Sequence, residues 1–366
     1  MLSGMEGIEF RAMLARAPGL TAEHVHALFA ATGDEPRFDP SLMRGVRIPA
    51  AARAFLSSPD MKELERDLQW IEASGVQLLL CTDANYPPLL AQISEAPSVL
   101  FVLGSIEALH SPQLAIVGSR TPTAAGRTTA HDFAAALTCS GLTITSGLAV
   151  GVDAASHEGA LLAGGSTVAV LGTGLDVVYP SVNRRLATRI RERGALVSEF
   201  PPRTGPLRRN FPQRNRIISG LSHGTLVVEA AHRSGSLGTA KWAADQGREV
   251  FAIPGSIHSQ LSRGCHKLIR EGATLVESPA DVVSELRIPL CRQRVTARTV
   301  HADGLPALDK GYEMLLDALG FEPATIDVLV ARTGFPGAAV ASMLLILELE
   351  GCVAALPGGR YDRIPK

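Results

Sequence analysis

Short apolar runs and amphipathic segments alternate regularly through the middle of the chain, from residue 114 to residue 286. The apolar positions are consecutive within each run, and a helix-like segment follows, as in LAIVG (114–118), TVAVLGTG (167–174) and GTLVVEA (224–230). Continuous apolar strands that alternate with helices are typical of a parallel sheet whose two faces are both buried. The pattern therefore predicts an α/β protein with a Rossmann-like, doubly wound parallel sheet.

Two further strand-like runs, VQLLLC (76–81) and VLFVLG (99–104), precede this region. They place the start of the sheet domain at residue 76, and its last helical segment places the end near residue 290. Before them, LTAEHVHALFAATG and MKELERDLQWIEASG have apolar positions at a spacing near 3.6 residues, which indicates amphipathic helices. A small helical domain is therefore expected over residues 1–75.

The last part of the chain returns to a helical pattern and then changes to strands. Residues 287–305 are polar and without periodicity, which predicts a linker. Three helix-like segments and the strand pair CVAALPGGRYDRI follow, and they predict a winged-helix domain over residues 306–366. Its third helix, GAAVASMLLILELEG, has no Lys or Arg. We therefore expect a protein-interaction or spacing role for this domain, and no sequence-specific binding to duplex DNA.

Composition narrows the class of protein. Apolar residues make up 46% of the chain, enough for a packed core and too many for a disordered protein. No apolar run reaches the length of a membrane span, and the N-terminus lacks the apolar segment of a signal peptide. The five cysteines are scattered without a CxxC pair, which favours reduced thiols in the cytoplasm and argues against a zinc site. No metal or cofactor is predicted.

Positive charge is concentrated in one segment, although the formal net charge of the whole chain is only −1. Residues 184–216 contain ten arginines and two acids, Glu192 and Glu199. A basic island in an otherwise acidic chain favours a site for a polyanion. A solvated helix face followed by a surface loop would give the same count, and charge alone does not separate the two interpretations.

Small polar residues follow the predicted strands. The first run of the sheet ends in Gly118, Ser119 and Arg120, the second is followed by Gly147, and the third contains GTG at residues 172–174. Ligands of doubly wound sheets bind at the carboxyl ends of the strands, and a guanidinium fork suits phosphate. Each strand end by itself is equally well explained by a tight turn. Three such ends in succession predict a polar crevice over the sheet.

The segment NFPQRNRIIS (210–219) places an aromatic residue among cations. Phe211 in such a loop suits base stacking, with the neighbouring arginines neutralising phosphates, but it equally suits a plug that anchors the loop in the core. The residues alone favour the core role for Phe211 and a binding role for Arg214 and Arg216. Further along, SGSLGTAKW (234–242) predicts an anion-friendly nest of backbone amides beside Lys241.

The motifs GSR (118–120), SGLAxGVD, LGTGLDxxYP, FPxRNRIISGLS, VVEAxxxSGSLxTA and SRGCHxLIREGA closely resemble, in order and spacing, those of the DNA processing protein A (DprA/Smf) family. The resemblance covers residues 76–286 and implies SAM-like helical and winged-helix flanks. It implies a non-enzymatic protein that binds and protects single-stranded DNA, forms homodimers and loads RecA recombinase in transformation or recombination. The residues that it implies for DNA binding are Arg120, Phe211, Arg214, Asn215, Arg216 and Lys241, with Ser119, Gly147 and Ser219 as further candidates. It places Leu268 and Ile269 at the dimer interface.

The competing hypothesis is an enzyme. The same region is similar to nucleoside-monophosphate phosphoribohydrolases, whose signature is PGGxGTxxE. Here the corresponding residues are SGSLGTAKW, so Trp242 stands where those enzymes have a catalytic glutamate. An indole cannot act as a general acid or base. Phosphate-loop and HExxH motifs are also absent, which further favours a binding protein. A small-nucleotide sensor on the same fold would need a closed pocket.

Overall fold

The computed structural model of the protein describes residues 7–32, 46–290, 310–320 and 323–364. The centre of the described chain is a nine-stranded sheet with the order β1-β2-β6-β5-β4-β3-β7-β8-β9. The strands are β1 (Gln77–Leu80), β2 (Val99–Gly104), β3 (Gln113–Val117), β4 (Thr143–Ser146), β5 (Thr167–Val170), β6 (Ala195–Ser198), β7 (Gly224–Val227), β8 (Glu249–Ala252) and β9 (Thr274–Leu275).

The strands from β6 across to β9 are all parallel, whereas β1 and β2 extend one edge in antiparallel pairing. The chain runs outward from β3 through β4 and β5 to β6, and then returns to the other side of β3 with β7, β8 and β9. The predicted doubly wound sheet is therefore confirmed. The direction of winding reverses between β3 and β7, the position at which such sheets bind ligands.

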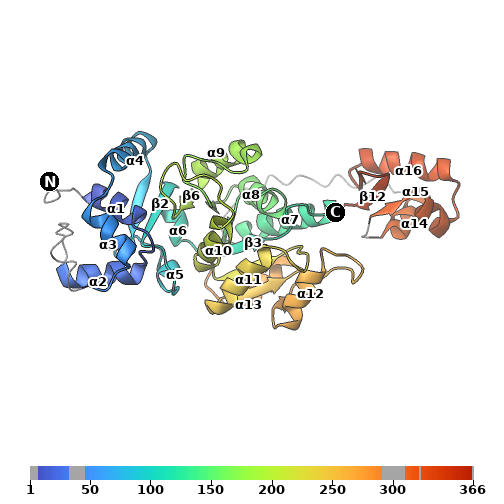
Figure 1. Ribbon diagram of the computed structural model, residues 1–366. Coiled ribbons are helices and arrows are strands. Elements are labelled where there is room, and N and C mark those ends of the chain that lie inside the picture. Colours follow the sequence, from blue (N-terminus) through green and yellow to red (C-terminus); the bar gives the residue numbers. More distant parts are fainter. Residues whose placement is uncertain (1–6, 33–45, 291–309, 321–322, 365–366) are drawn as a thin grey trace.

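Helices cover both faces of the sheet (Figure 1). Strand β3 shows why a central strand of such a sheet is apolar along its length. Leu114 and Ile116 belong to the core on one face, whereas Ala115 and Val117 belong to the core on the other. Alternate residues of a strand point to opposite faces, so both sets must be apolar when both faces are buried. The covering helices are α7 (Ala124–Cys139), α8 (Val152–Leu162), α9 (Arg184–Arg193), α10 (Asn210–Gly220), α11 (Ser236–Asp245), α12 (Arg263–Arg270) and α13 (Pro279–Leu286), and the short helices before them are α5 (Pro88–Ala91) and α6 (Glu107–His110).

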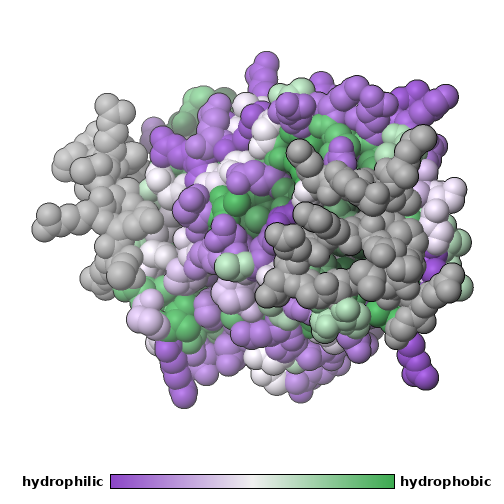
Figure 2. Space-filling model, turned by 90° about the vertical axis from the view of Figure 1, so that its left-hand side faces the viewer, coloured by the Kyte–Doolittle hydropathy of each residue, from purple (hydrophilic) through white to green (hydrophobic). Residues whose placement is uncertain are grey.

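The N-terminal helices are not independent of the sheet. Met13, Leu56 and Ile71 lie in the same hydrophobic core as Phe101 of β2. The predicted boundary at residue 75 thus divides helices from strands but does not divide two cores. The surface at this end of the molecule is largely hydrophilic, with smaller hydrophobic areas between the polar side chains (Figure 2). The helices are α1 (Gly7–Arg16), α2 (Ala22–Thr32), α3 (Ala50–Ser57) and α4 (Met61–Ser74).

The C-terminal residues form a winged helix with a core of its own, as predicted. Leu315, Leu329 and Leu344, one from each of its three helices, meet in that core. Its elements are α14 (Lys310–Leu319), β10 (Ala324–Thr325), α15 (Ile326–Thr333), α16 (Gly337–Leu349), β11 (Val353–Leu356) and β12 (Arg360–Arg363). Most of the predicted linker, from residue 291 onward, lies outside the described residues.

Within the described ranges, no single helix has the length and apolar composition needed to cross a membrane. Helices α15 and α16 meet these criteria only when taken together, and they are bent by 111° at the break between them.

Candidate nucleic-acid interface

An arginine and two aromatic rings meet on the surface above the carboxyl ends of β3 and β5. The Cζ atom of Arg120, which follows β3, lies 5.9 Å from the centre of the Phe211 ring on α10. The ring of Tyr179, from the loop after β5, lies 5.5 Å from that of Phe211. Arg120 is exposed, and Tyr179 is 45% exposed. We call Arg120, Tyr179 and Phe211 the platform, because they offer flat π-surfaces and a cation at one place.

Glycine at a strand end allows the Phe211 ring to lie directly on the backbone. A Cβ atom at Gly172 would come within 3.0 Å of Phe211 Cδ1. Phe211 is half-buried, so one part of the ring is seated on the chain while the rest contacts Tyr179 and Arg120. The two roles considered for Phe211, an anchor for the loop and a stacking surface, are therefore compatible.

Arg214 lies beneath the platform and is 4% exposed. Its Nη1 donates hydrogen bonds to the carbonyl oxygen of Gly147, at 2.7 Å, and to that of Val170. Burial lowers its pKa to about 10, the nearby Asp153 carboxylate opposes this effect, and Arg120 adds to it. Arg214 therefore links the carboxyl ends of β4 and β5, and its charge is held inside the protein.

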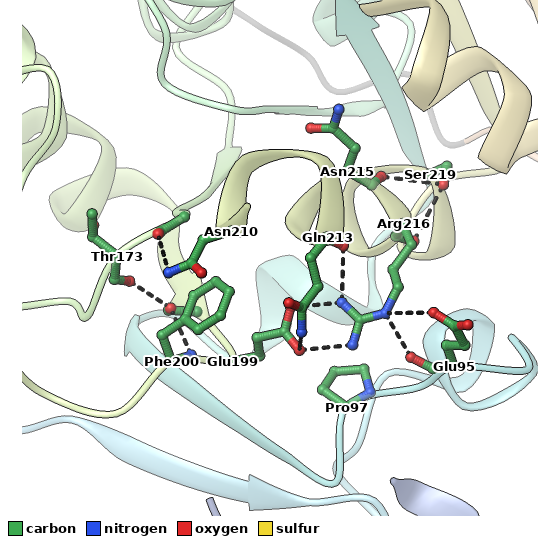
Figure 3. Close-up of polar contacts among 12 residues, drawn as sticks. Glu95, Pro97, Thr173, Glu199, Phe200, Asn210, Gln213, Asn215, Arg216 and Ser219 are labelled. Atoms are coloured by element: carbon green, nitrogen blue, oxygen red, sulfur yellow. Dashed lines mark hydrogen bonds and ion pairs between the residues drawn. The ribbon is translucent and has the colours of Figure 1, made fainter. Parts of the chain in front are cut away.

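Arg216 is also occupied within the protein (Figure 3). Its guanidinium binds both carboxylate oxygens of Glu199, at 2.6 and 2.7 Å, and the carbonyl oxygen of Glu95 at 2.8 Å. Its side chain is 6% exposed. The contacts tie α10 to the end of β6 and to the segment after α5. Both arginines are thus held by internal partners, which gives them a positioning role, and the direct phosphate contacts predicted for Arg214 and Arg216 stay predictions.

The smaller predicted residues shape the backbone. A Cβ atom at Gly147 would lie 2.6 Å from Nη1 of Arg214, so this glycine makes room for the arginine. Ser119 is buried and accepts a hydrogen bond from the N–H of Thr121 at 3.1 Å. Ser219 is completely buried and donates to carbonyl oxygens of its own helix. None of the three offers an exposed side chain to a ligand.

Lys241 and Asn215 remain accessible beside the platform helix. Lys241 lies on α11 and is exposed, and no ion pair within the described part of the chain involves it. Asn215 is half-buried and donates to the carbonyl oxygen of Gly235, at 3.4 Å, just before α11 begins. The first N–H groups of α11 have partners within the protein, because Ser236 donates to the Ser234 hydroxyl and the next two N–H groups donate to backbone carbonyl oxygens. The predicted nest of backbone amides is therefore already occupied by internal hydrogen bonds.

Reasoning from the sequence left Tyr179, Arg208 and Arg209 out of the candidate site. Tyr179 had a recognisable signal, since it is an aromatic residue in the polar segment after a glycine-rich strand end. Arg208 and Arg209 are both exposed and directly precede α10. Their signal was present in the basic island, but the arginines of that segment could not be sorted by exposure.

The loop that carries these two arginines is held by the N-terminal helices. Asp67 on α4 is 1% exposed and binds both Arg16 and Arg203, the latter at 2.5 Å. The backbone N–H of Arg203 donates to the Asp176 carboxylate at 2.9 Å. No chemistry was predicted for the N-terminal helices. The structure shows that the buried Asp67 carboxylate of α4 holds one edge of the candidate interface in place.

The predicted dimer residues differ in accessibility. Leu268 on α12 is buried in the core of its own chain, and Ile269 is partly buried against that core. Adjacent helical residues point about 100° apart, which explains why the two side chains differ. Leu268 is therefore used within the protomer, and a dimer contact through Ile269 stays a prediction.

A cavity of about 540 Å³ lies near the reversal point of the sheet, and Thr123, Glu229 and His258 are among the residues that line it. The Glu229 carboxylate accepts hydrogen bonds from the N–H and the hydroxyl of Thr123, at 2.9 and 2.7 Å. Burial raises the pKa of Glu229. No Lys or Arg is among the described residues that line the cavity, so it does not favour an anionic nucleotide or a sensor role. No cluster of three metal-binding side chains occurs within the described residues.

Comparisons with known proteins agree with this organisation. The model of the family described as DNA recombination-mediator protein A matches residues 77–287, and that of the DprA winged helix domain matches residues 300–359. Protein Smf of Escherichia coli (strain K12) is 45% identical over 315 residues, which cover 86% of this chain and 84% of the relative. DNA processing protein DprA of Streptococcus pneumoniae (strain ATCC BAA-255 / R6) is 44% identical over 241 residues, which cover 66% of this chain and 83% of the relative.

Two solved structures are similar to this one. The X-ray structure of DNA processing protein A from Streptococcus pneumoniae has a TM-score of 0.67 and 38% identity, and the match covers 76% of this chain and 97% of that chain. A structure that describes the single-stranded DNA binding mode of DNA processing protein A from Helicobacter pylori has a TM-score of 0.53 and 27% identity. That match covers 58% of this chain and 95% of the other.

Proposed function

The chain belongs to the DNA processing protein A (DprA/Smf) family, and we propose that it binds single-stranded DNA on the platform of Arg120, Tyr179 and Phe211. The observation that carries the proposal is that the exposed Arg120 lies against the ring of Phe211, which in turn contacts the ring of Tyr179, at the carboxyl edge of the sheet. Stacking on aromatic rings combined with phosphate neutralisation is how proteins bind single strands without reading base edges.

Each part of the platform has a separate task. The rings of Tyr179 and Phe211 stack unpaired bases, and Arg120 donates to a phosphate oxygen through its planar fork. Lys241, on one side, and the loop cations Arg208 and Arg209 bind neighbouring phosphates. Duplex DNA binds more weakly because its bases are already stacked on each other. The buried Arg214 and Arg216 keep the strand ends and α10 in place beneath the bound strand.

The finer biological role follows from this mode of binding. We propose that the protein protects single strands in the cytoplasm and passes them to RecA recombinase as a homodimer that uses Ile269. The proposal is supported by the match to the family described as a recombination mediator. A platform that stacks bases and binds phosphates accepts any sequence, as a mediator of general recombination requires. We assign no catalysis to the site, because Trp242 replaces the carboxylate that a phosphoribohydrolase needs.

The test is a binding titration of the wild-type protein with a single-stranded oligonucleotide, the matching duplex and AMP, each at two salt concentrations. Single strands should bind most tightly and lose affinity as salt rises, because bound phosphates release counterions. The same preparation should release no free base from AMP. Equal affinity for AMP and for the oligonucleotide, or release of base that an Arg120→Ala variant abolishes, would contradict the proposal.

A further inference from the structure

The basic island contains a second group of arginines that the platform does not use. Five of the ten lie on α9, and every one of them is exposed: Arg184, Arg185, Arg189, Arg191 and Arg193. The buried face of the helix consists of Leu186, Ala187 and Ile190. Packing of α9 on the sheet therefore requires none of its arginines, and Glu192 is its single acid.

Three arginines of α9 form a stripe along one side of the helix. Arg185, Arg189 and Arg193 are four residues apart, so their side chains lie above one another on one face, with roughly 6 Å between successive residues. No ion pair within the described ranges involves an arginine of this helix. Their side-chain hydrogen bonds are long ones to carbonyl oxygens, from Arg191 to Ser74 and from Arg193 to Gly164, both at 3.4 Å.

The first turn and the four-residue spacing of these arginines are unfavourable for the helix itself, whereas Arg191 and Arg193 lie in the last turn, where the dipole favours positive charge. Arg184 and Arg185 occupy the first turn, where the helix dipole disfavours positive charge, and like charges four residues apart repel each other. Asn183 precedes the helix but does not cap it, because its side-chain amide donates to the carbonyl oxygen of Leu148 at 2.8 Å. A bound polyanion would relieve both effects, since it supplies negative charge to the first turn and along the stripe.

The stripe begins next to the platform. Tyr179 lies five residues before Arg184, and only the loop and the short turn Ser181–Asn183 separate the aromatic ring from the start of α9. Val182 in that turn is 73% exposed, so an apolar contact for a base or sugar lies between the two. A strand whose bases stack on Tyr179 is therefore separated from the first arginines of α9 only by this short, exposed turn.

We propose that the outer face of α9 is a second track for phosphates, which binds the segment of a single strand that extends beyond the platform. The proposal rests on the proposed function, because the platform defines where the strand starts. A second track leads to a prediction that the platform alone does not make. Affinity should rise with oligonucleotide length, and the additional affinity should depend on salt and on α9.

The experiment compares an oligothymidylate of about 6 nucleotides, which suits a single site, with one of roughly 20 nucleotides that can reach both surfaces. The double variant Arg185→Gln/Arg189→Gln is compared with Lys62→Gln/Arg66→Gln, which removes the same charge from exposed positions of α4. The α9 variant should bind the short strand like the wild type and the long strand roughly tenfold more weakly at low salt. Its salt slope for the long strand should be flatter by about 1.4, or about 0.7 for each lost phosphate contact. The α4 variant should match the wild type in both assays.

Several outcomes would overturn the inference while the proposed function stands. The α9 variant could bind the long strand with the affinity and slope of the wild type, in which case α9 is a solvated face. It could instead lose affinity for duplex DNA alone, in which case the stripe serves a duplex.

If the wild type binds neither single strand, the proposed function fails and the inference falls with it. Thermal unfolding without DNA should show the α9 variant at least as stable as the wild type, because repulsion is removed.

Discussion

Helices α9 and α10 carry arginines of the same basic island but use them in opposite ways. On α10, Arg214 and Arg216 are 4% and 5% exposed and bind oxygen atoms of the protein. On α9, all five arginines are exposed. The difference shows that a count of charges along a sequence measures only a capacity for binding a polyanion. Burial and internal partners decide which charges a ligand reaches.

The largest expected effect is on stability and comes from the ion pair beneath α10. Arg216→Ala should reduce the free energy of unfolding by about 3–5 kcal/mol, because it leaves the Glu199 carboxylate, whose side chain is 10% exposed, without its partner. Urea unfolding measures the loss. Arg185→Ala on α9 is the control and should leave the free energy of unfolding nearly unchanged. Equal stability of the two variants would remove the distinction between the helices.

The buried imidazole of His157 stays neutral, which makes the stability of the protein depend on pH. His157 is fully buried on α8, its Nδ1 lies 2.7 Å from the Thr167 hydroxyl, and burial lowers its pKa from 6.5 to about 3. Below pH 6.5 the unfolded chain binds a proton that the folded protein does not. This residue should therefore cost stability as the pH falls from about 6.5 toward 3, by up to about 1.4 kcal/mol per pH unit.

Urea unfolding at pH 7 and pH 5 measures this dependence. His157→Gln should lose less stability between the two pH values than the wild type does. His232→Gln, at an exposed position, should behave like the wild type. The same pH dependence in all three proteins would show that His157 does not contribute to it.

The space that Gly147 leaves for Arg214 gives a smaller effect. Gly147→Ala should cost about 1–3 kcal/mol of stability, because the new methyl group collides with a buried guanidinium that would have to leave its hydrogen bonds to two backbone carbonyl oxygens. Gly235→Ala is the matched control, since no atom lies within 4 Å of the added methyl group and the backbone is helical there. Calorimetric melting of both variants tests the difference. If the Gly147→Ala variant melts at the same temperature as the Gly235→Ala variant, Arg214 is not tightly held.

The smallest effect is expected from the winged helix. Its third helix, α16, has no basic residue, and Glu348 and Glu350 lie at its end. Removing residues 306–366 should therefore change the affinity for single-stranded DNA by no more than a few-fold. Fluorescence anisotropy with a labelled oligonucleotide measures this. A loss of two orders of magnitude would mean that the platform and α9 are not the main binding surface.

The fold could be predicted well because most strands of the sheet consist largely of consecutive apolar residues. The helix-like segment expected after TVAVLGTG (167–174) is present as α9, Arg184–Arg193. The shared core of the N-terminal helices could not be predicted. An amphipathic pattern shows that a helix buries one face, but it does not identify the surface against which the face packs.

The site was predicted in part, and the failures have a common cause. Arg120 follows a strand end, and strand ends of a doubly wound sheet reach the surface at a known edge, so its exposure could be anticipated. Arg216 looked equally available, but its acidic partner Glu199 is separated from it by 17 positions and is brought beside it only by the fold. Asp67, which fixes the loop of Arg208 and Arg209, is more than 130 positions from Arg203.

The central claim, that single strands stack on Phe211 while Arg120 neutralises a phosphate, is tested most directly by salt titrations of two variants with one oligonucleotide. Phe211→Ala should lose about 1–3 kcal/mol of binding free energy with an unchanged slope of log K against log salt, because it removes a stacking surface and no charge. Arg120→Ala should flatten that slope by about 0.7 for every sequence alike. Wild-type affinity in both variants would contradict the claim, as would a flattened slope for Phe211→Ala alone.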